Sequence, residues 1–175
     1  MTKVLCFLPV VLFSLGLGAC ATGLSGPVTP IPVDAGGTAN LISAYRAESG
    51  LGPVTVDSRL MQAAADHARA MAARDKIGHR VGGSLAKRVA RAGYDWGATA
   101  ENLGAGYPTL DAAMAGWKGS AGHRANLLNR LVTEIGVAAF AAPPGSRRRT
   151  YWTLILATPR LERIAAGAGG PWSLQ

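Results

Sequence analysis

Helical and strand patterns are segregated along this chain, and this order restricts the fold class more than any other feature. Apolar residues recur at helical spacing between Thr38 and Gly119, in four stretches that are separated by breaks. Asp57 or Ser58 can cap the second stretch, and Thr109 can cap the fourth. The helices predicted from these patterns span residues 38–49, 58–76, 84–93 and 109–119.

Two strand-like segments follow the helices. Ile135, Val137 and Ala139 alternate with their neighbours, and residues 151–157 are dense in aromatic and β-branched side chains. The Pro-Pro-Gly sequence at 143–145 turns the chain between them. Helices followed by a hairpin indicate an α+β or three-layer arrangement and exclude repeated β-α-β units.

The first residues predict export. Lys3 precedes an apolar run from Val4 to Leu17, which is shorter than the roughly 20 residues that span a bilayer as a helix. The run closes on Leu-Gly-Ala-Cys, which resembles the lipobox of bacterial lipoproteins with Cys20 as the lipidated residue. We therefore expect a signal peptide at 1–19 and an outer-membrane lipoprotein of the cell envelope, facing the periplasm or the cell surface. Ordinary signal cleavage nearby is the alternative.

Cysteine usage then limits how the exported domain is stabilised. The chain has two cysteines, Cys6 and Cys20, and the first lies in the predicted signal, so the mature chain has no internal disulfide and depends on its core. About 155 residues follow Cys20, enough for one domain. We place this domain at 38–160, after a proline-containing tether at 20–37 and before a loose Gly/Ala-rich tail at 161–175.

The net charge bears on possible partners. The formal charge of +8 falls to +7 once Lys3 is removed, which favours acidic neighbours such as phospholipid head groups and other envelope polymers. Export makes nucleic acid an unsuitable partner. Arg147, Arg148 and Arg149 form the one dense basic run. We interpret this run as a solvated loop, with a binding patch as the alternative.

The histidines differ in their sequence context. His67 lies in the middle of a predicted helix on its apolar stripe, so we expect a packed core residue. His79 and His123 each follow a glycine in a break between helices, where binding and catalytic side chains concentrate. Glu101 and Asn102, in a nearly uncharged stretch, are the third candidate group.

In this order the motifs resemble the CAP superfamily of cysteine-rich secretory, antigen 5 and pathogenesis-related proteins, in its short bacterial branch. The resemblance covers about residues 40–158. The matching segments are Leu41–Arg46 with Gly50-Leu51, Ala68–His79, Ala100–Leu103, Trp117–Leu128, Ile135–Val137 and Tyr151–Thr153. The most specific match is Trp117–Leu128, which contains the family's Trp, Ser, Gly-His and Asn-Leu-Leu pattern.

This resemblance implies a three-layer α-β-α sandwich with one open cleft. The cleft would contain His79, Glu101 and His123, with Ser120, Asn102 and Trp117 beside them. Two departures from the family pattern matter. Ser120 stands where many members have a second glutamate, and Ala100 replaces a glycine, which could tighten a turn.

Three functions stay open for such a cleft. Two imidazoles and a carboxylate suit a divalent metal such as zinc at His79, His123 and Glu101, and Glu101 and His123 would be the catalytic candidates of a metal-assisted hydrolase. A binding module would instead take a lipid or cell-wall component, in a shallow groove near Tyr107, Pro108 and Trp117. The cluster could also be structural only. We favour the binding module; the oligomeric state is not predicted.

Overall fold

A single mixed sheet forms the middle layer of the structure. The computed structural model describes residues 26–160. The strands are β1 (Thr29–Ile31), β2 (Thr55–Val56), β3 (Trp96–Ala105), β4 (Glu134–Ala141) and β5 (Thr150–Pro159). Their order is β1-β4-β5-β3, with antiparallel pairing throughout, and the short β2 adds a parallel pairing to the start of β4. Strand β3 is therefore the last strand on its side of the sheet.

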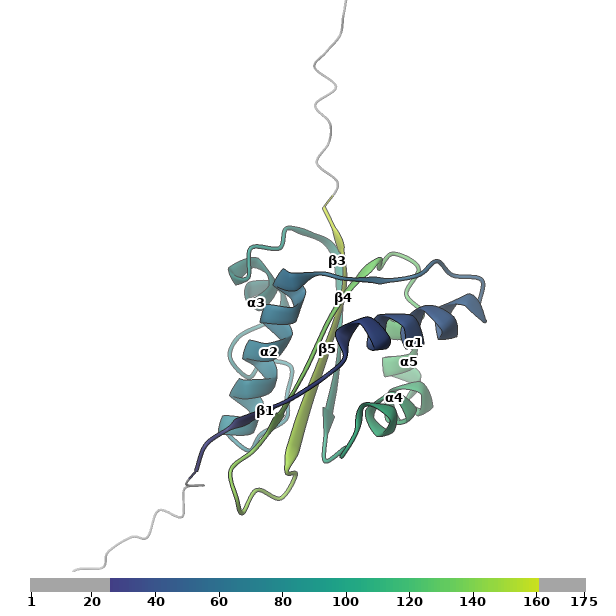
Figure 1. The fold of residues 1–175 in the computed structure, drawn as a ribbon. Coiled ribbons are helices and arrows are strands. Elements are labelled where there is room, and N and C mark those ends of the chain that lie inside the picture. The colour runs from purple at the N-terminus through teal and green to yellow at the C-terminus, as the bar shows by residue number, and fades with distance from the viewer. Residues whose placement is uncertain (1–25, 161–175) are drawn as a thin grey trace, which may run out of the picture.

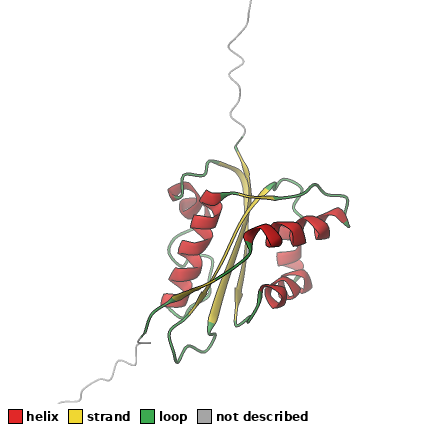
Figure 2. Cartoon of the chain, in the orientation of Figure 1, coloured by secondary structure: helices red, strands yellow, loops and turns green. Residues whose placement is uncertain are grey.

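Five helices cover the two faces of this sheet (Figures 1 and 2). They are α1 (Ala35–Ala47), α2 (Ser58–Ala73), α3 (Leu85–Arg91), α4 (Leu110–Gly119) and α5 (Ala121–Leu127). Helices α2 and α3 lie on one face, and α1, α4 and α5 lie on the other (Figure 1). The predicted α-β-α sandwich is thus confirmed.

Strand β5 shows why the sheet requires two helical layers. Trp152, Leu154 and Leu156 alternate with Tyr151 and Ile155, and all five side chains are buried. The first three pack in the core beneath α1, α4 and α5, and the other two pack in the cores beneath α2 and α3. A strand that is apolar on both faces must be covered on both.

The caps of the helices follow the sequence prediction closely. Asp57 and Thr109 accept hydrogen bonds from the first-turn amides of α2 and α4, as expected of N-caps. Ser84 caps α3 in the same way. Helix α2 ends at Ala73, three residues before the predicted end, because the chain turns at Asp75, whose φ is +45°.

A buried arginine connects α1 to the loop between α5 and β4. Arg46 is 2% exposed, and its guanidinium donates to four backbone carbonyls. The acceptors are Gly52 O at 2.8 Å, Leu127 O at 2.8 Å, Asn129 O at 2.9 Å and Val132 O at 3.1 Å. Since a buried cation needs this degree of hydrogen bonding, Arg46 fixes the loop that leads from α5 into β4.

Regular structure begins before residue 38, inside the segment that we predicted to be a tether. Residues 29–31 pair with β4, from Thr29 opposite Ala141 to Ile31 opposite Ala139, and α1 begins at Ala35. We had expected the prolines to prevent regular structure here. Pro30 is tolerated because β1 is an exposed edge strand, where a missing amide donor need not leave a pairing unsatisfied.

Two further elements were not predicted. Residues 96–105 form the long strand β3, whose small residues obscure the alternation, and Ala100 pairs with Leu156 inside it, so there is no turn for Ala100 to tighten. His123 lies within the short helix α5, which we had expected to be an irregular segment.

Several sequence predictions lie outside the described residues. These are the signal at 1–19, lipidation of Cys20, the first part of the tether and the tail at 161–175. Within residues 26–160, no helix combines the length and apolar character that crossing a membrane requires.

Helix α2 and strand β4 approach each other most closely at Gly136. A β-carbon at this position would overlap the backbone of Leu60 and Met61 in α2. Backbone atoms inside a helix cannot move aside independently, so the absence of a side chain here sets the distance between the helix and the sheet.

We expect Gly136→Ala to lower the free energy of unfolding by about 3 kcal/mol or more, because an overpacked core must shift a whole element. Urea denaturation followed by circular dichroism measures this change. The matched control is Gly119→Ala, where no atom lies within 4 Å of the new β-carbon and a small gain is expected. Equal effects of the two substitutions would contradict the close-contact argument.

Candidate functional site

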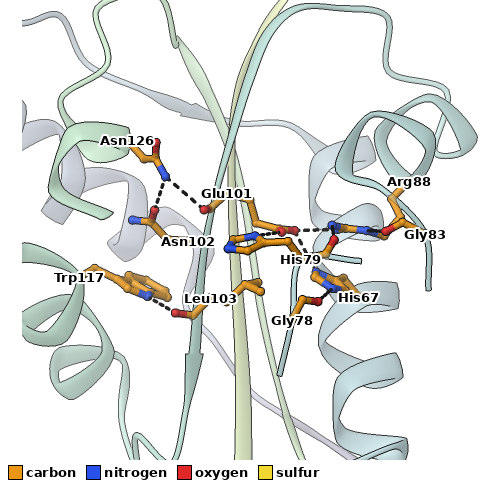
Figure 3. Close-up of polar contacts among 10 residues, drawn as sticks. All are labelled: His67, Gly78, His79, Gly83, Arg88, Glu101, Asn102, Leu103, Trp117 and Asn126. Carbon is orange, nitrogen blue, oxygen red and sulfur yellow. Dashed lines mark hydrogen bonds and ion pairs between the residues drawn. The ribbon is translucent and has the colours of Figure 1, made fainter. Parts of the chain in front are cut away.

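Strand β3 presents two adjacent polar residues to opposite faces of the sheet. Glu101 points towards α2 and α3, whereas Asn102 points towards α5, as the alternation of a strand requires (Figure 3). Because β3 is the last strand on its side, the two faces meet around its free edge. Residues from both helical layers can therefore reach this edge.

The Glu101 carboxylate is the centre of a buried polar cluster, in which only 2% of its side chain is exposed. Its Oε2 lies 2.9 Å from His67 Nδ1 and 2.7 Å from Arg88 Nη1. Its Oε1 lies 2.8 Å from His79 Nδ1 (Figure 3). Three elements, α2, the α2–α3 connection and α3, thus converge on one side chain.

Arg88 also holds the connection that carries His79. Its Nε donates to Gly83 O at 3.2 Å, and its Nη2 donates to His79 O at 3.1 Å. The Nη1 contact with Glu101 is an ion pair without the alignment of a hydrogen bond. The guanidinium therefore positions both the carboxylate and the backbone of the histidine that faces solvent.

Charge keeps Glu101 ionised despite its burial. Burial by itself would raise the pKa of Glu101, but the hydrogen bond from His67 and the contact with Arg88 outweigh it and lower the pKa to about 2. An ionised carboxylate only accepts hydrogen bonds, so His67 and His79 must each carry a proton on Nδ1.

The second nitrogen of each ring then has a different role. His67 Nε2 lies 3.2 Å from Gly78 O, so each nitrogen of this fully buried ring faces a protein oxygen and neither is open to a ligand. The His79 side chain is 63% exposed. When His79 is neutral, its proton is held on Nδ1 by Glu101, and Nε2 presents a lone pair to the open side of the cluster.

Side chains from α4 and α5 cover the free edge of β3 on the other side. Asn126 Nδ2 donates to Glu101 O at 3.2 Å and to Asn102 Oδ1 at 2.9 Å. Trp117 Nε1 donates to Leu103 O at 3.0 Å. These bonds satisfy backbone carbonyls that an edge strand would otherwise leave unpaired (Figure 3).

Asn102 fixes the backbone at His123, the remaining histidine of the predicted site. Its Nδ2 donates to His123 O at 3.0 Å, which fixes the backbone of α5 where His123 is half-buried. Burial, and to a smaller degree the neighbouring His79, lowers the pKa of His123. The two imidazoles therefore influence each other electrostatically across the edge of β3, and His123 is neutral at pH 7.

Not every predicted residue has the role that we expected. Trp117 is fully buried and packs in the core, and Asn102 is buried beneath His123, so neither lines an open groove. Ser120 is half-buried between α4 and α5 and makes no side-chain capping bond. His79 alone of the predicted histidines contacts Glu101 directly.

Two members of the cluster were missed. We assigned His67 to the core on its apolar helix stripe, and it is buried, but as a hydrogen-bond partner of Glu101. Arg88, in the third predicted helix, was not among the site candidates, and it is 3% exposed. The sequence offered a weak signal for His67. A polar residue on an apolar helix stripe needs a buried hydrogen-bond partner, and Glu101 could have been that partner.

The predicted zinc site does not fit these side chains. Both Glu101 oxygens are already engaged, and the buried Arg88 guanidinium supplies a positive charge that opposes a cation. Among residues 26–160, no three His, Cys, Asp or Glu side chains are arranged to hold a metal ion. Arg80 and Arg124, which are adjacent in sequence to the two predicted histidine ligands, are both exposed.

Comparison with known proteins agrees with this architecture. Residues 39–156 match the model of the cysteine-rich secretory protein family, CAP. An uncharacterized protein of Bacillus subtilis, YkwD, is 30% identical over 99 residues, which are 55% of this chain and 38% of that protein. The chain thus spans well under half the length of this relative.

Solved structures show the same fold. An extracellular protein from Bacillus anthracis that contains an SCP domain superposes with a TM-score of 0.59 at 26% identity, covering 68% of this chain and 38% of that one. An outer surface protein from Borrelia burgdorferi gives a TM-score of 0.65 at 18% identity, covering 75% and 98%. The bacterial surface locations of these proteins are consistent with export of this chain.

We expect acid to destabilise the fold through Glu101. Its pKa is lower in the folded state than the ordinary value of 4.5, so its stabilising effect is complete above about pH 5 and is lost as the pH falls towards 2. The shift to about 2 corresponds to roughly 3 kcal/mol. Urea denaturation between pH 7 and pH 3 should show this loss in the wild type. In Glu101→Gln the slope should be smaller; an unchanged slope would contradict the assignment.

Proposed function

Because the chain belongs to the cysteine-rich secretory protein family, CAP, we propose that it is an exported binding module of the bacterial cell envelope. In this proposal, lipid on Cys20 holds the protein at the membrane, and a lipid or cell-wall component binds at the edge of β3. The observation that carries this proposal is that the Glu101 cluster has two parts. His67, Arg88 and Glu101 form a buried inner part, and His79 forms an exposed outer part.

The buried inner part of the cluster has a structural role, and this role does not account for the exposed His79. His67, Arg88 and Glu101 are buried and make one another's ion pairs. His79 is different, because Glu101 orients a ring whose side chain is 63% exposed. A side chain fixed by a buried carboxylate and left open to solvent is suited to receive a ligand, since its orientation costs little on binding.

The chemistry of this outer part suits hydrogen-bond recognition. In the neutral form, His79 Nε2 accepts a hydrogen bond, and the neutral His123 offers a second ring nearby. Hydroxyl and amide groups, which are common in lipid head groups and cell-wall fragments, are the matching donors. Nothing in this recognition requires a metal ion.

The hydrolase alternative receives less support from the same geometry. A general base works best with a pKa near the operating pH, and a buried carboxylate with a pKa of about 2 is a weak base at pH 7. Glu101 is also covered by His67, His79 and Arg88, so a substrate or water would first have to displace one of them.

An apolar groove between α1 and α4 is a separate candidate site for the acyl chain of a lipid. It has a volume of about 440 Å³ and is lined by Leu41, Ala44, Leu110 and three neighbours. Leu41 is 44% exposed here although it belongs to the helix facing the core. Its size falls within the usual range of ligand sites. A second groove, of about 870 Å³, is lined in part by Gly106 and Pro108, so the groove predicted near Tyr107, Pro108 and Trp117 stays a prediction, although Trp117 itself is buried.

The histidine site is tested with His79→Ala and soluble muropeptides or short-chain phosphatidylglycerol in isothermal titration. We expect at least one of these ligands to bind the wild type and affinity to fall at least about tenfold in the variant, equivalent to about 1.4 kcal/mol. Stability should change by less than about 1 kcal/mol, because the lost ring is exposed. Lys87→Ala, on the exposed face of α3, is the control. Unchanged binding in His79→Ala would overturn this site.

The groove is tested separately with Leu41→Glu and a fluorescent fatty acid. A buried charge beside an acyl chain should abolish the fluorescence increase that the wild type gives. The matched control is Leu131→Glu, because Leu131 is 65% exposed and lies outside the groove. If the fluorescence increase were lost in both variants, or kept in both, the groove would be excluded as the lipid site.

A further inference from the structure

The connection between β4 and β5 carries three consecutive exposed cations. Arg147, Arg148 and Arg149 all lie in this loop at one end of the sheet. The sequence alone favoured a solvated loop, which would be free to move. The structure shows a loop that is tied to the domain by several hydrogen bonds.

Asp75, at the end of α2, anchors this loop from below. Its Oδ1 accepts hydrogen bonds from the hydroxyls of Ser146 and, at 2.7 Å, Tyr151. Ser146 Oγ in turn accepts from the amides of Arg148 at 3.2 Å and Arg149 at 3.1 Å. Asp75 offsets one of the three positive charges, and the loop keeps an excess of two.

The backbone of Arg149 supports a defined conformation. Its φ of +63° lies in the left-handed region, which a non-glycine residue adopts only when its surroundings impose it. Ala142 N donates to Arg149 O at 2.8 Å, which closes the loop. The arginine side chains therefore extend from a fixed base.

The N-terminal segment enters the domain at the same end. A β-carbon on Gly26 would lie 3.0 Å from Pro144 and 3.5 Å from Pro143, so the described chain begins against the loop. Pro27 and Thr29 line a groove of about 870 Å³ together with residues 141–146 and Arg149. In Figure 1, β1 and the β4–β5 connection reach the same lower end of the molecule.

The distance to Cys20 follows from the chain length. Five residues lie between Cys20 and Gly26, which makes six steps along the chain, and an extended chain spans at most about 3.6 Å per residue. A lipid on Cys20 would thus keep the bilayer surface within roughly 20 Å of the basic loop. The field of an anionic surface decays over about 8 Å in physiological salt, so a short approach brings the arginines into it.

We propose that this end of the domain docks on the membrane, with Arg147, Arg148 and Arg149 binding anionic phospholipid head groups. The inference rests on the proposed lipid anchor, because the anchor brings the loop to the surface. An acidic protein is the weaker candidate, since the short link to Cys20 leaves little room for one beneath the loop.

Docking in this orientation leaves the histidine cleft open. Glu101 lies four strand positions from Ala105, where β3 reaches the loop end, which corresponds to roughly 13 Å along the strand. The free edge of β3 faces sideways from this axis (Figure 1). The cleft would then stand just above the head groups, accessible to an envelope ligand.

The experiment uses the full chain, produced in a bacterium and reconstituted into vesicles of phosphatidylcholine, with or without about one third phosphatidylglycerol. A fluorophore on Pro144→Cys reports the loop, and one on Leu131→Cys reports the opposite end of the sheet. Head-group nitroxide lipids quench fluorophores that lie at the surface. We expect quenching of the Pro144 position to be at least threefold stronger in the anionic vesicles and to disappear in 0.5 M salt.

The charge is tested with the variant Arg147→Gln/Arg148→Gln/Arg149→Asn, in which Asn tolerates the left-handed conformation at 149. Loss of three cations should shift the docked population by roughly 100-fold, so quenching falls to the level of neutral vesicles. The matched control Lys87→Gln/Arg91→Gln/Arg130→Gln removes the same charge from other exposed positions and should leave quenching unchanged. Thermal unfolding confirms that both variants are folded.

Three results would overturn the proposal: equal quenching in both kinds of vesicle, equal quenching at both fluorophore positions, or no effect of the loop variant. The intact mass of the chain reports lipid on Cys20 independently. If that lipid is absent, the anchor fails, and the same chain is added to preformed vesicles. Loop-dependent quenching would then support docking without an anchor, and its absence would refute docking.

Discussion

The ion pairs of Glu101 connect the layers of this protein. Its carboxylate binds His67 of α2, Arg88 of α3 and His79 between them, while its backbone carbonyl accepts Asn126 of α5. One residue on an edge strand therefore fixes segments from both faces of the sheet. Removing Arg88 or Glu101, which are both buried, would leave an uncompensated buried charge, whereas His79 is exposed and contributes less to stability.

In the same cluster, the buried residues position the exposed His79, which we propose as the ligand-binding residue. The buried ions around Glu101 determine where the α2–α3 connection lies, and the connection determines which nitrogen of His79 faces solvent. A ligand that binds this ring meets a group already held in place. The Arg88 guanidinium and the engaged oxygens of Glu101 also make these side chains unsuitable for the zinc ion that their residue types first indicated.

Most of the helical layers could be predicted from the sequence, because caps such as Asp57 and Thr109 and the apolar stripes are local signals. Strand β3 could not, since Gly and Ala hide its alternation and its burial depends on distant helices. Motif order identified Glu101, His79 and His123. Arg88 escaped prediction because its charged side chain is buried only through contacts made in three dimensions.

The last two strands in sequence among the described residues, β4 and β5, lie in the middle of the sheet. Strands β1 and β2 pair with β4, and β3 and β4 pair with β5, so no described strand has a partner until residues 134–159 exist. A polypeptide leaving the ribosome would consequently stay unpaired for most of its synthesis. A secretion channel admits only an extended chain, so in a chain exported by such a channel this topology would delay folding until the last strands had crossed.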